Sequence, residues 1–376
     1  MNDRLEEAAD RWDTPIYVTD VDAALANAER WRQAYPDALV AYAVKANPDP
    51  ALLQRLADER FGFEVVGPIE LALALRAGCP SERNVVNGVG QTDADLADAL
   101  ASGALVNAES LGALDALLAS RPGRIGLRVN PALDADTHPH LATGAATSKF
   151  GIALDELTDA IARVRRAGVT LTSIGAHIGS GITDAQPFGR LAQLLARLAA
   201  ETGAQWIDLG GGFAGAPNDH AEAVRPHLPQ GSRLILEPGR SIVANAGWLV
   251  TRVVRVQERG HLVADAGMSE LIRPMLYGAK HPVTLLRPGA RVEHRSWTLS
   301  GPICEAGDIL ANDVDLGDEV GEGALLAIGD AGAYGLAMSS SYNGRLRPAQ
   351  AVIDRGELRL SRRRETLDDL VSRDVE

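Results

Sequence analysis

Eight short runs of apolar, mostly β-branched residues occupy residues 38 to about 240, and each is followed by a longer segment of helical period. The runs lie at 38–45, 62–66, 84–88, 104–108, 124–130, 171–178, 206–210 and 233–237. Near-continuous apolar strands joined by helical crossovers are typical of a parallel sheet that is buried on both faces. The count of eight favours a closed (β/α)8 barrel, with an open doubly wound sheet as the alternative.

After about residue 247 the pattern changes to short alternating segments, at 249–258, 261–267, 290–301, 324–330 and 350–361, punctuated by Gly, Asp and Pro. This alternation predicts an antiparallel β domain. The segment TPIYVTD (14–20) has the same character and precedes the first barrel strand. The predicted fold class is therefore α/β, a TIM-type barrel over 25–246 followed by a C-terminal antiparallel β domain. We expect residues 1–24 plus 247–376 to form this β-rich domain and to complete the active site.

Charge and cysteine content exclude several classes of function. Lys and Arg total 37 against 50 Asp and Glu, so the formal net charge is −13 and nucleic-acid binding is disfavoured. Two cysteines, Cys79 and Cys304, provide neither a disulfide framework nor a thiolate cluster for a metal. The acidic N-terminus and the lack of a long apolar run predict a cytoplasmic protein with no membrane partner. Since there is no cysteine cluster, we also expect no metal.

Reactive groups collect at four predicted strand ends, which is where TIM barrels carry their active sites. Lys45 ends the first strand, His177 the sixth and Glu237 the eighth, and Gly210, Gly211 and Gly212 follow the seventh. Each has an ordinary structural explanation: a solvated lysine, a core histidine, a tight turn, a Pro-Gly turn with surface charges. If the site had no function, all four of these explanations would have to hold together. The convergence of these residues at one end of the barrel therefore favours a functional site.

The combination of an amine, a glycine loop and a carboxylate points to pyridoxal 5′-phosphate as cofactor. A partly desolvated lysine can bond to an aldehyde, and backbone N–H groups of a glycine loop can bind a phosphate. A carboxylate that faces the pyridine nitrogen keeps the ring electron-withdrawing, and Glu237 is the candidate for it.

The C-terminal half carries a second group of polar motifs: DAGMSELIRPMLYGAKH (265–281), GPICEAGDIL (301–310) and GDAGAYGLAMSSSYNGRLRPAQ (329–350). A lone cysteine is usually a small buried hydrophobe. The polar surroundings of Cys304, with Glu305 and Asp308 in a Gly-rich turn, favour a functional role for it.

Seven motifs, in order and spacing, resemble the diaminopimelate decarboxylases, which belong to the alanine-racemase-like fold class of pyridoxal-phosphate enzymes. They are YAVKAN, HIGS, DLGGGF, EPGRS, DAGMSELIRPMLYGA, GPICEAGD and GAYGLAMSSSYN. The resemblance runs over nearly the whole chain. It implies a homodimer whose active sites lie between subunits, and decarboxylation of meso-2,6-diaminopimelate to L-lysine and carbon dioxide, the last step of that route to lysine.

The resemblance also implies roles for individual residues. Lys45 looks like the lysine that bonds to the cofactor, His177 like the residue packed on its ring, and Glu237 like the partner of its pyridine nitrogen. Cys304 looks like the proton donor, contributed by the other subunit. The implied phosphate-side contacts are Ser180, Gly211, Gly212, Gly239, Arg240 and Tyr334, and the implied substrate contacts are Arg240, Arg273, Tyr277, Glu305 and Tyr334.

The sequence departs from the family at three positions. Gly67 stands where serine is usual, Gly181 where glutamine is common, and Ala306 where serine is frequent. None of these changes removes a reacting group, so they leave the substrate open but not the chemistry. Three alternative functions stand beside the one that the resemblance implies: a sister decarboxylase that acts on carboxynorspermidine or on a siderophore or antibiotic precursor, a non-catalytic pyridoxal-phosphate-binding protein, and a racemase.

Overall fold

The computed structural model describes residues 1–133, 143–289, 296–317 and 320–375, and divides into two compact units. One unit comprises residues 25–242, and the other comprises residues 1–24 and 243–376. Helix α2 (Val21–Ala34) carries the chain from the second of these into the first.

The unit 25–242 is a closed parallel barrel. The strands pair in the order β2-β3-β4-β5-β6-β8-β9-β10, and both the β5–β6 and the β10–β2 pairings close the ring. The predicted closed barrel is thereby confirmed, and the open sheet is excluded. The strands are β2 (Leu39–Ala43), β3 (Gly62–Val65), β4 (Asn84–Val86), β5 (Leu105–Ala108), β6 (Arg124–Asn130), β8 (Thr170–Gly175), β9 (Trp206–Asp208) and β10 (Arg233–Leu236); the short β7 (Ile152–Ala153) pairs with β6.

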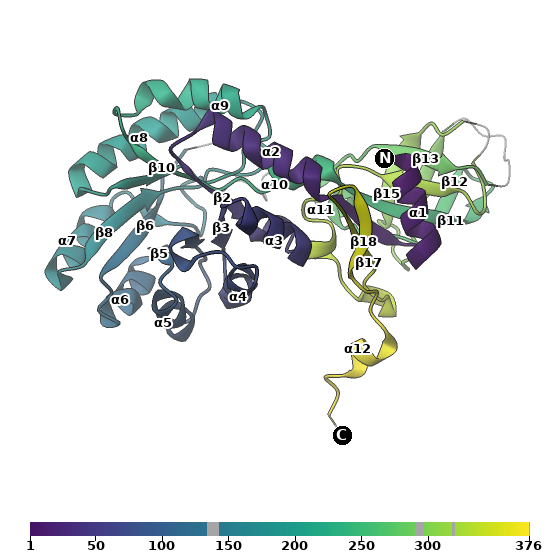
Figure 1. Cartoon of the computed structure of the whole chain (residues 1–376), viewed down its shortest axis with the longest axis horizontal. Coiled ribbons are helices and arrows are strands. Elements are labelled where there is room, and N and C mark those ends of the chain that lie inside the picture. The colour runs from purple at the N-terminus through teal and green to yellow at the C-terminus, as the bar shows by residue number, and fades with distance from the viewer. Residues whose placement is uncertain (134–142, 290–295, 318–319, 376) are drawn as a thin grey trace. The chain divides into compact units, whose positions relative to one another are not determined.

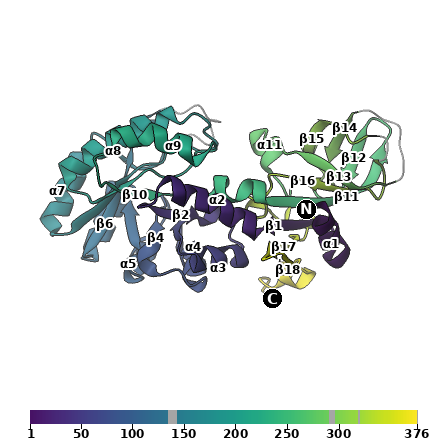
Figure 2. The ribbon, with the colours of Figure 1, turned by 45° about the horizontal axis from the view of Figure 1, so that its top comes forward.

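Helices cover the outside of the barrel strands (Figure 1, Figure 2). Several begin at side-chain caps: Asp49 accepts from the N–H groups of Ala51 and Leu52, and Thr92 forms a capping box with Asp95. The barrel helices are α3 (Pro50–Asp58), α4 (Pro68–Arg76), α5 (Asp93–Ala101), α6 (Leu111–Ala119), α7 (Leu157–Ala167), α8 (Gln186–Thr202), α9 (Pro217–Val224) and α10 (Arg240–Val243).

The second unit is built on a mixed sheet in the order β15-β14-β12-β11-β1-β17-β18, with β16 pairing both β11 and β13. The pairs β1–β17 and β12–β14 are parallel, whereas the sequence pattern predicted antiparallel pairing throughout. Parallel pairing needs a long connection between the two strands, and the whole barrel lies in the chain between β1 and β17. TPIYVTD lies in this sheet, because it forms β1 and pairs with β11 as well as β17.

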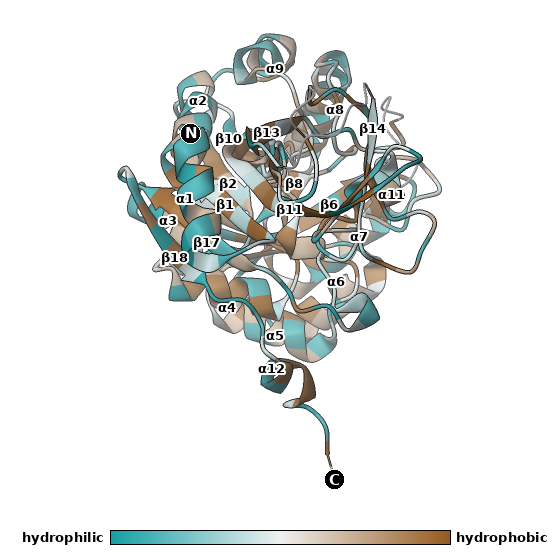
Figure 3. Cartoon of the chain, turned by 90° about the vertical axis from the view of Figure 1, so that its right-hand side faces the viewer, coloured by the Kyte–Doolittle hydropathy of each residue, from teal (hydrophilic) through white to brown (hydrophobic). Residues whose placement is uncertain are grey.

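Both faces of this sheet are buried. Ile16 and Val18 of β1 belong to one apolar cluster, whereas Tyr17 and the fully buried Trp297 belong to another. Hydrophobic residues concentrate on the strands, and hydrophilic ones on helices such as α1 (Figure 3). The elements of this unit are α1 (Asn2–Trp12), β1 (Ile16–Asp20), β11 (Gly247–Gln257), β12 (His261–Ala264), α11 (Arg273–Tyr277), β13 (Val283–Arg287), β14 (Trp297–Ser300), β15 (Ile309–Val314), β16 (Leu325–Ile328), β17 (Ala349–Asp354), β18 (Glu357–Arg362) and α12 (Leu367–Val371). Residues 290–295 of the predicted strand at 290–301 lie outside the described part of the chain.

The barrel interior changes from apolar to polar along the strands. Val85, Leu105 and Ile235 pack together in an apolar cluster. Two residues further along the same strands the side chains are those of Asn87, Asn107 and Glu237. Because side chains of a strand alternate between its faces, the i and i+2 residues point to the same side. The polar layer therefore lies one step nearer the carboxyl ends of the strands.

The absence of a side chain at Gly126 on β6 leaves room for the contact between Asn107 and Ser173 in this polar layer. A methyl group at residue 126 would lie 1.8 Å from Oδ1 of Asn107 and 2.1 Å from Oγ of Ser173. These two side chains are buried and hydrogen-bonded to each other, so neither can move aside without losing that bond.

We expect Gly126→Ala to lower the free energy of unfolding by about 1–3 kcal/mol, the usual cost of overpacking a dense interior. Gly123→Ala is the matched control, because a methyl group there meets no atom within 4 Å. The measurement is denaturant unfolding of both variants and the wild type. Equal stability of the two variants would show that the space beside Gly126 is not filled as described.

Candidate active site

Lys45 is the cation of the polar layer. It lies in a 3-10 turn (η1, Val44–Ala46) just after β2, rather than on the strand that the sequence pattern extended to it. Its Nζ lies 2.5 Å from Oε2 of Glu64 on β3. The Glu64 side chain is 1% exposed and that of Lys45 is 34% exposed, so the carboxylate is buried while the amine faces the barrel mouth. A buried carboxylate of this kind is strongly destabilising without its cationic partner.

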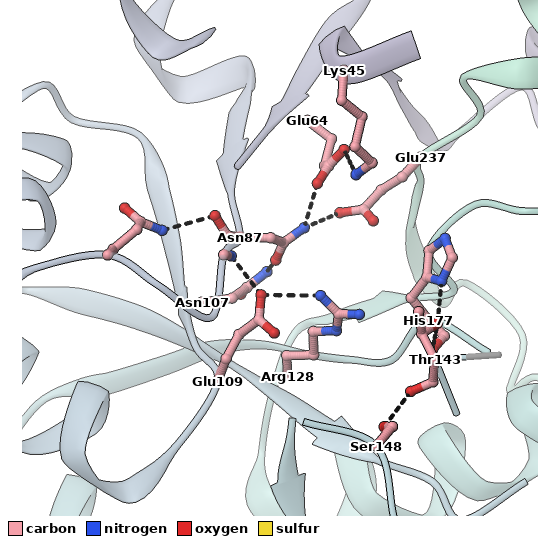
Figure 4. Close-up of polar contacts among 12 residues, drawn as sticks. Lys45, Glu64, Asn87, Asn107, Glu109, Arg128, Thr143, Ser148, His177 and Glu237 are labelled. Atoms are coloured by element: carbon pink, nitrogen blue, oxygen red, sulfur yellow. Dashed lines mark hydrogen bonds and ion pairs between the residues drawn. The ribbon is translucent and has the colours of Figure 1, made fainter. Parts of the chain in front are cut away.

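A chain of amide hydrogen bonds links this ion pair to Glu237, just after β10 (Figure 4). Nδ2 of Asn87 donates to Oε1 of Glu237 at 2.7 Å and to Oε1 of Glu64 at 3.4 Å. Nδ2 of Asn107 donates to Oδ1 of Asn87 at 2.9 Å, and Oγ of Ser173 donates to Oδ1 of Asn107 at 2.9 Å. Each amide therefore has a fixed orientation, and Asn87 holds both carboxylates with one NH2 group.

Glu237 and Asp208 are neighbouring buried carboxyl groups. Burial, and next the charges of Asp208 and Glu64, hold the pKa of Glu237 well above its usual range. Burial raises the pKa of Asp208 to about 6, against the opposing effect of the Gly210 N–H, which donates to its Oδ1 at 2.9 Å. Two like charges this close disfavour joint ionisation, so a proton is retained within the pair.

Arg128 on β6 supplies a second cation. It forms an ion pair with the buried Glu109 at 3.0 Å, and its guanidinium lies over the ring of Phe150. It lines one small cavity together with Glu237, Asp208 and His177. Its charge lowers the pKa values of both carboxyl groups and of the histidine.

His177 follows β8 by two residues and is fixed by Thr143. Oγ1 of Thr143 lies 2.8 Å from Nδ1 of the imidazole and donates to the His177 carbonyl, and Ser148 in turn donates to the Thr143 carbonyl (Figure 4). Burial, with the charges of Arg128 and Lys45, holds the pKa of His177 well below its usual value. A neutral imidazole therefore faces this cavity.

The loops after β8, β9 and β10 approach each other too closely for side chains. A methyl group at Gly211 would lie 2.1 Å from the carbonyl oxygen of Glu237, and one at Gly212 1.8 Å from that of Gly179. Gly212 also has a φ of +99°, which favours glycine. The loops form a cradle in which backbone can approach a ligand directly, a common phosphate site in TIM barrels.

Arg240 lies beside this cradle at the start of α10, next to Gly239. Its Nη2 and Nε lie 3.1 and 3.3 Å from Oγ of Ser180. A guanidinium and a hydroxyl beside a glycine loop are the donors that an anion requires. The amine, the buried carboxyl, the imidazole and this cradle together fit pyridoxal phosphate. The departure Gly181 adopts a φ of +78°, a conformation in which a glutamine side chain would be strained.

The remaining predicted residues belong to the other unit. Cys304 and Glu305 are exposed, in a loop held by the buried Asp308. The Asp308 carboxylate accepts the N–H groups of Met268 at 2.5 Å and Ile303 at 2.7 Å. The sequence analysis named Asp308 only as a polar neighbour of Cys304. In the structure, the Asp308 carboxylate orders the loop that carries this cysteine.

Three further predicted residues lie on helix α11 and on the turn after β16. The Arg273 guanidinium lies 5.9 Å from the centroid of the Tyr277 ring on the same helix. Tyr334 has a φ of +57°, which is uncommon for a residue with a side chain and is found mostly where the surrounding structure imposes it.

Sequence reasoning missed several polar residues of the barrel layer and one that contacts a predicted residue in the other unit. Those in the barrel are Glu64, Asn87, Asn107, Glu109, Arg128, Thr143 and Asp208. In the other unit, Oη of Tyr342 donates to Oε1 of Glu305 at 2.6 Å. A signal was present for Asn87 and Asn107: each is a polar residue two positions after an inward apolar residue on a buried strand.

Comparison with known families supports this chemistry. Residues 22–244 match the family model described as pyridoxal-dependent decarboxylase, pyridoxal binding domain. The chain is 40% identical to the diaminopimelate decarboxylase of Deinococcus radiodurans, over 99% of this chain and 98% of that protein. It is 39% identical to the diaminopimelate decarboxylase of Aquifex aeolicus, over 98% and 93% of the two chains.

Solved structures agree with the fold over the whole chain. Diaminopimelate decarboxylase from Helicobacter pylori, solved in complex with L-lysine, has a TM-score of 0.92 and 31% identity, covering 98% of each chain. An arginine decarboxylase of Paramecium bursaria Chlorella virus has a TM-score of 0.81 at 21% identity, which shows a shared fold. No helix in the described residues has the length and apolar character of a membrane span.

The raised pKa of Asp208 predicts a pH-dependent stability. A carboxyl with a folded-state pKa of about 6, against 3.8 normally, binds its proton more tightly in the folded chain than in the unfolded one. The free energy of unfolding therefore falls as pH rises from about 4 to about 6. Asp208→Asn mimics the protonated form, so its stability relative to wild type should rise over this interval and then level off.

Urea unfolding of cofactor-free protein at a series of pH values measures this difference. Asp219→Asn, at an exposed carboxylate on α9, is the control and should run parallel to the wild type. Parallel curves for Asp208→Asn as well would contradict the assignment of a retained proton to the Asp208–Glu237 pair.

Proposed function

The chain belongs to the diaminopimelate decarboxylase family of pyridoxal-dependent decarboxylases, and from this premise we propose how its residues convert meso-2,6-diaminopimelate into L-lysine and carbon dioxide. The observation that carries the proposal is the cluster of Lys45, Glu64 and Glu237 at the barrel mouth, which combines an available amine with a proton-retaining carboxyl. Whole-length similarity to diaminopimelate decarboxylases supports the substrate. This reaction is the last step of lysine biosynthesis by the diaminopimelate route.

We assign the cofactor contacts to the barrel residues. Nζ of Lys45 would hold the aldehyde carbon of pyridoxal phosphate, the carboxyl of Glu237 would face its pyridine nitrogen, and the neutral imidazole of His177 would pack on its ring. When bound, the cofactor supplies an electron sink for the electron pair left behind by carbon dioxide. The phosphate-side ligands would be Ser180, Gly211, Gly212, Gly239, Arg240 and Tyr334.

Glu64 lies in direct contact with Lys45, with its Oε2 2.5 Å from Nζ, and is therefore placed to take up a proton from this amine when Lys45 bonds to the cofactor. Asn87 limits the movement of both Glu64 and Glu237 during this exchange, since one amide group donates to both. Preorganised groups of this kind need no rearrangement when charge moves.

Substrate recognition is assigned to Arg240, Arg273, Tyr277, Glu305 and Tyr334. The distal end of diaminopimelate carries an ammonium and a carboxylate, for which Glu305 and Arg273 are the matching charges. Tyr342 orients Glu305 through its 2.6 Å hydrogen bond. The Cys304 thiol would return a proton to the carbon that loses carbon dioxide.

We further propose a cytoplasmic homodimer in which Cys304 acts in the active site of the partner subunit. The exposed position of Cys304 supports this arrangement, because a group that serves a neighbouring chain must be reachable from outside its own unit. Neither cysteine forms a disulfide, which agrees with a reducing compartment.

Incubation of the holoenzyme with meso-diaminopimelate should release carbon dioxide and lysine in equal amounts, and turnover of lysine or ornithine should be lower by about 10⁴-fold. Lys45→Ala should abolish turnover. Lys45→Arg should be equally inactive, although it keeps a cation beside Glu64 and so controls for misfolding. Comparable turnover of ornithine would indicate a sister decarboxylase, and borohydride fixation of the cofactor on a different lysine would contradict the role of Lys45.

Mixed dimers test the shared site. Lys45→Ala and Cys304→Ala should each be nearly inactive alone, because every site then lacks one of the two groups. Reassembly of a mixture should place both defects in one site and leave the other intact, giving about half of the wild-type activity per heterodimer. If subunit exchange is demonstrated by mass spectrometry and activity does not return, the two residues act within one chain.

A further inference from the structure

A cavity of about 790 Å³ lies at the amino ends of the barrel strands, the opposite end from the lysine and carboxyl cluster. Its lining comes from the starts of β2, β6, β8, β9 and β10 and from the residues just before β3 and β4. The volume falls within the range of cavities that bind small molecules. Five arginines line it, at positions 32, 60, 83, 124 and 233, together with the carboxylates of Asp37 and Glu82.

Backbone carbonyls and aromatic rings hold four of these arginines. Nη1 of Arg83 donates to the carbonyl of residue 60 at 2.8 Å, and Nη2 of Arg124 to the carbonyl of residue 103 at 3.1 Å. The guanidinium of Arg32 lies 4.5 Å from the centroid of the ring of residue 61, and that of Arg233 lies 4.1 Å from the centroid of the Trp206 ring. Contacts with carbonyls and rings fix a guanidinium in place while its charge remains available.

Four of the five arginines form no ion pair among the described residues, and the lining keeps an excess of positive charge over Asp37 and Glu82. Arg32 is paired with Glu29. Within the described ranges, no carboxylate lies at ion-pair distance from Arg60, Arg83, Arg124 or Arg233, although the whole chain carries a net charge of −13. Several guanidinium groups around one cavity repel each other, and a bound anion would remove that repulsion.

We propose that this cavity binds a small polyanion, a metabolite that carries two or more phosphate or carboxylate groups. Arginine forks bind both groups in the same bidentate way, so the chemistry common to the two is the recognition element. One monovalent anion could not satisfy several separated guanidinium groups. The site is separate from the phosphate cradle at Gly211 and Gly212, which belongs to the other end of the barrel.

Isothermal titration of the holoenzyme with pyrophosphate and, separately, with citrate at physiological ionic strength tests the proposal. We expect saturable binding of at least one probe, at one site per chain. Binding of pyrophosphate alone would identify phosphates as the natural ligand groups, and binding of citrate alone would identify carboxylates. The visible absorbance of the cofactor should not change, because the cofactor site lies elsewhere.

Two variants locate the site. Arg60→Gln and Arg124→Gln should each weaken binding by about tenfold or more, the effect of losing a charge-assisted hydrogen bond. Arg197→Gln is the matched control, because it removes the same charge from α8, outside the cavity. The Arg197 side chain is 67% exposed and lies 4.0 Å from Glu201, so its loss should leave binding unchanged. Turnover is not needed for any of these measurements, so their outcome is independent of the proposed decarboxylation.

Three results would overturn the proposal. The first is an absence of saturable binding for both probes, and the second is an equal weakening by all three variants, which would indicate a general charge effect. The third is displacement of the cofactor by the probe, which would place binding in the phosphate cradle.

Arg124→Lys keeps the charge but loses the fork, and binding as weak as in Arg124→Gln would show that geometry rather than charge is recognised.

Discussion

Four buried carboxyl groups inside one barrel must be balanced by protons or cations, and this requirement organises the site. Glu64 is balanced by Lys45, and Glu237 and Asp208 retain a proton between them because burial and mutual repulsion disfavour two charges. Arg128, paired with Glu109, contributes the remaining positive charge. The strength of the electrostatic effects in such a desolvated layer explains why the same groups are suited to moving protons.

The barrel provides this layer through the alternation of side chains. Strands β4, β5 and β10 each place an apolar residue in the interior and, two positions later, a polar one follows, as with Val85 and Asn87. The apolar layer excludes water from below, and the amides of Asn87 and Asn107 fix the carboxylates above it. Because Gly126 has no side chain, there is room for the contact between Asn107 and Ser173.

Much of this architecture could be predicted from the sequence. Eight β-branched runs with helical segments between them specify a parallel barrel, and the polar layer of the structure lies at the strand ends that the sequence singled out. The polar layer was not predicted, because partners such as Glu64 and Asn87 come from separate strands and no local pattern joins them. Likewise, the parallel pairing of β1 with β17 depends on residues more than 300 positions apart, beyond the reach of periodicity. The roles of Cys304 and Arg273 stay predictions until the experiments above are done.

The position of β1 has a consequence for how the chain is made. This strand lies between β11 and β17 in the middle of its sheet, yet it is synthesised before the whole barrel, and both of its partners after it. The barrel can therefore fold during translation before either edge of β1 is able to pair. One apolar face of β1 can be covered at once, because Leu5, Ala8 and Ala9 of α1 pack with Ile16 and Val18, whereas both edges of the strand stay unpaired until β11 and then β17 have been made.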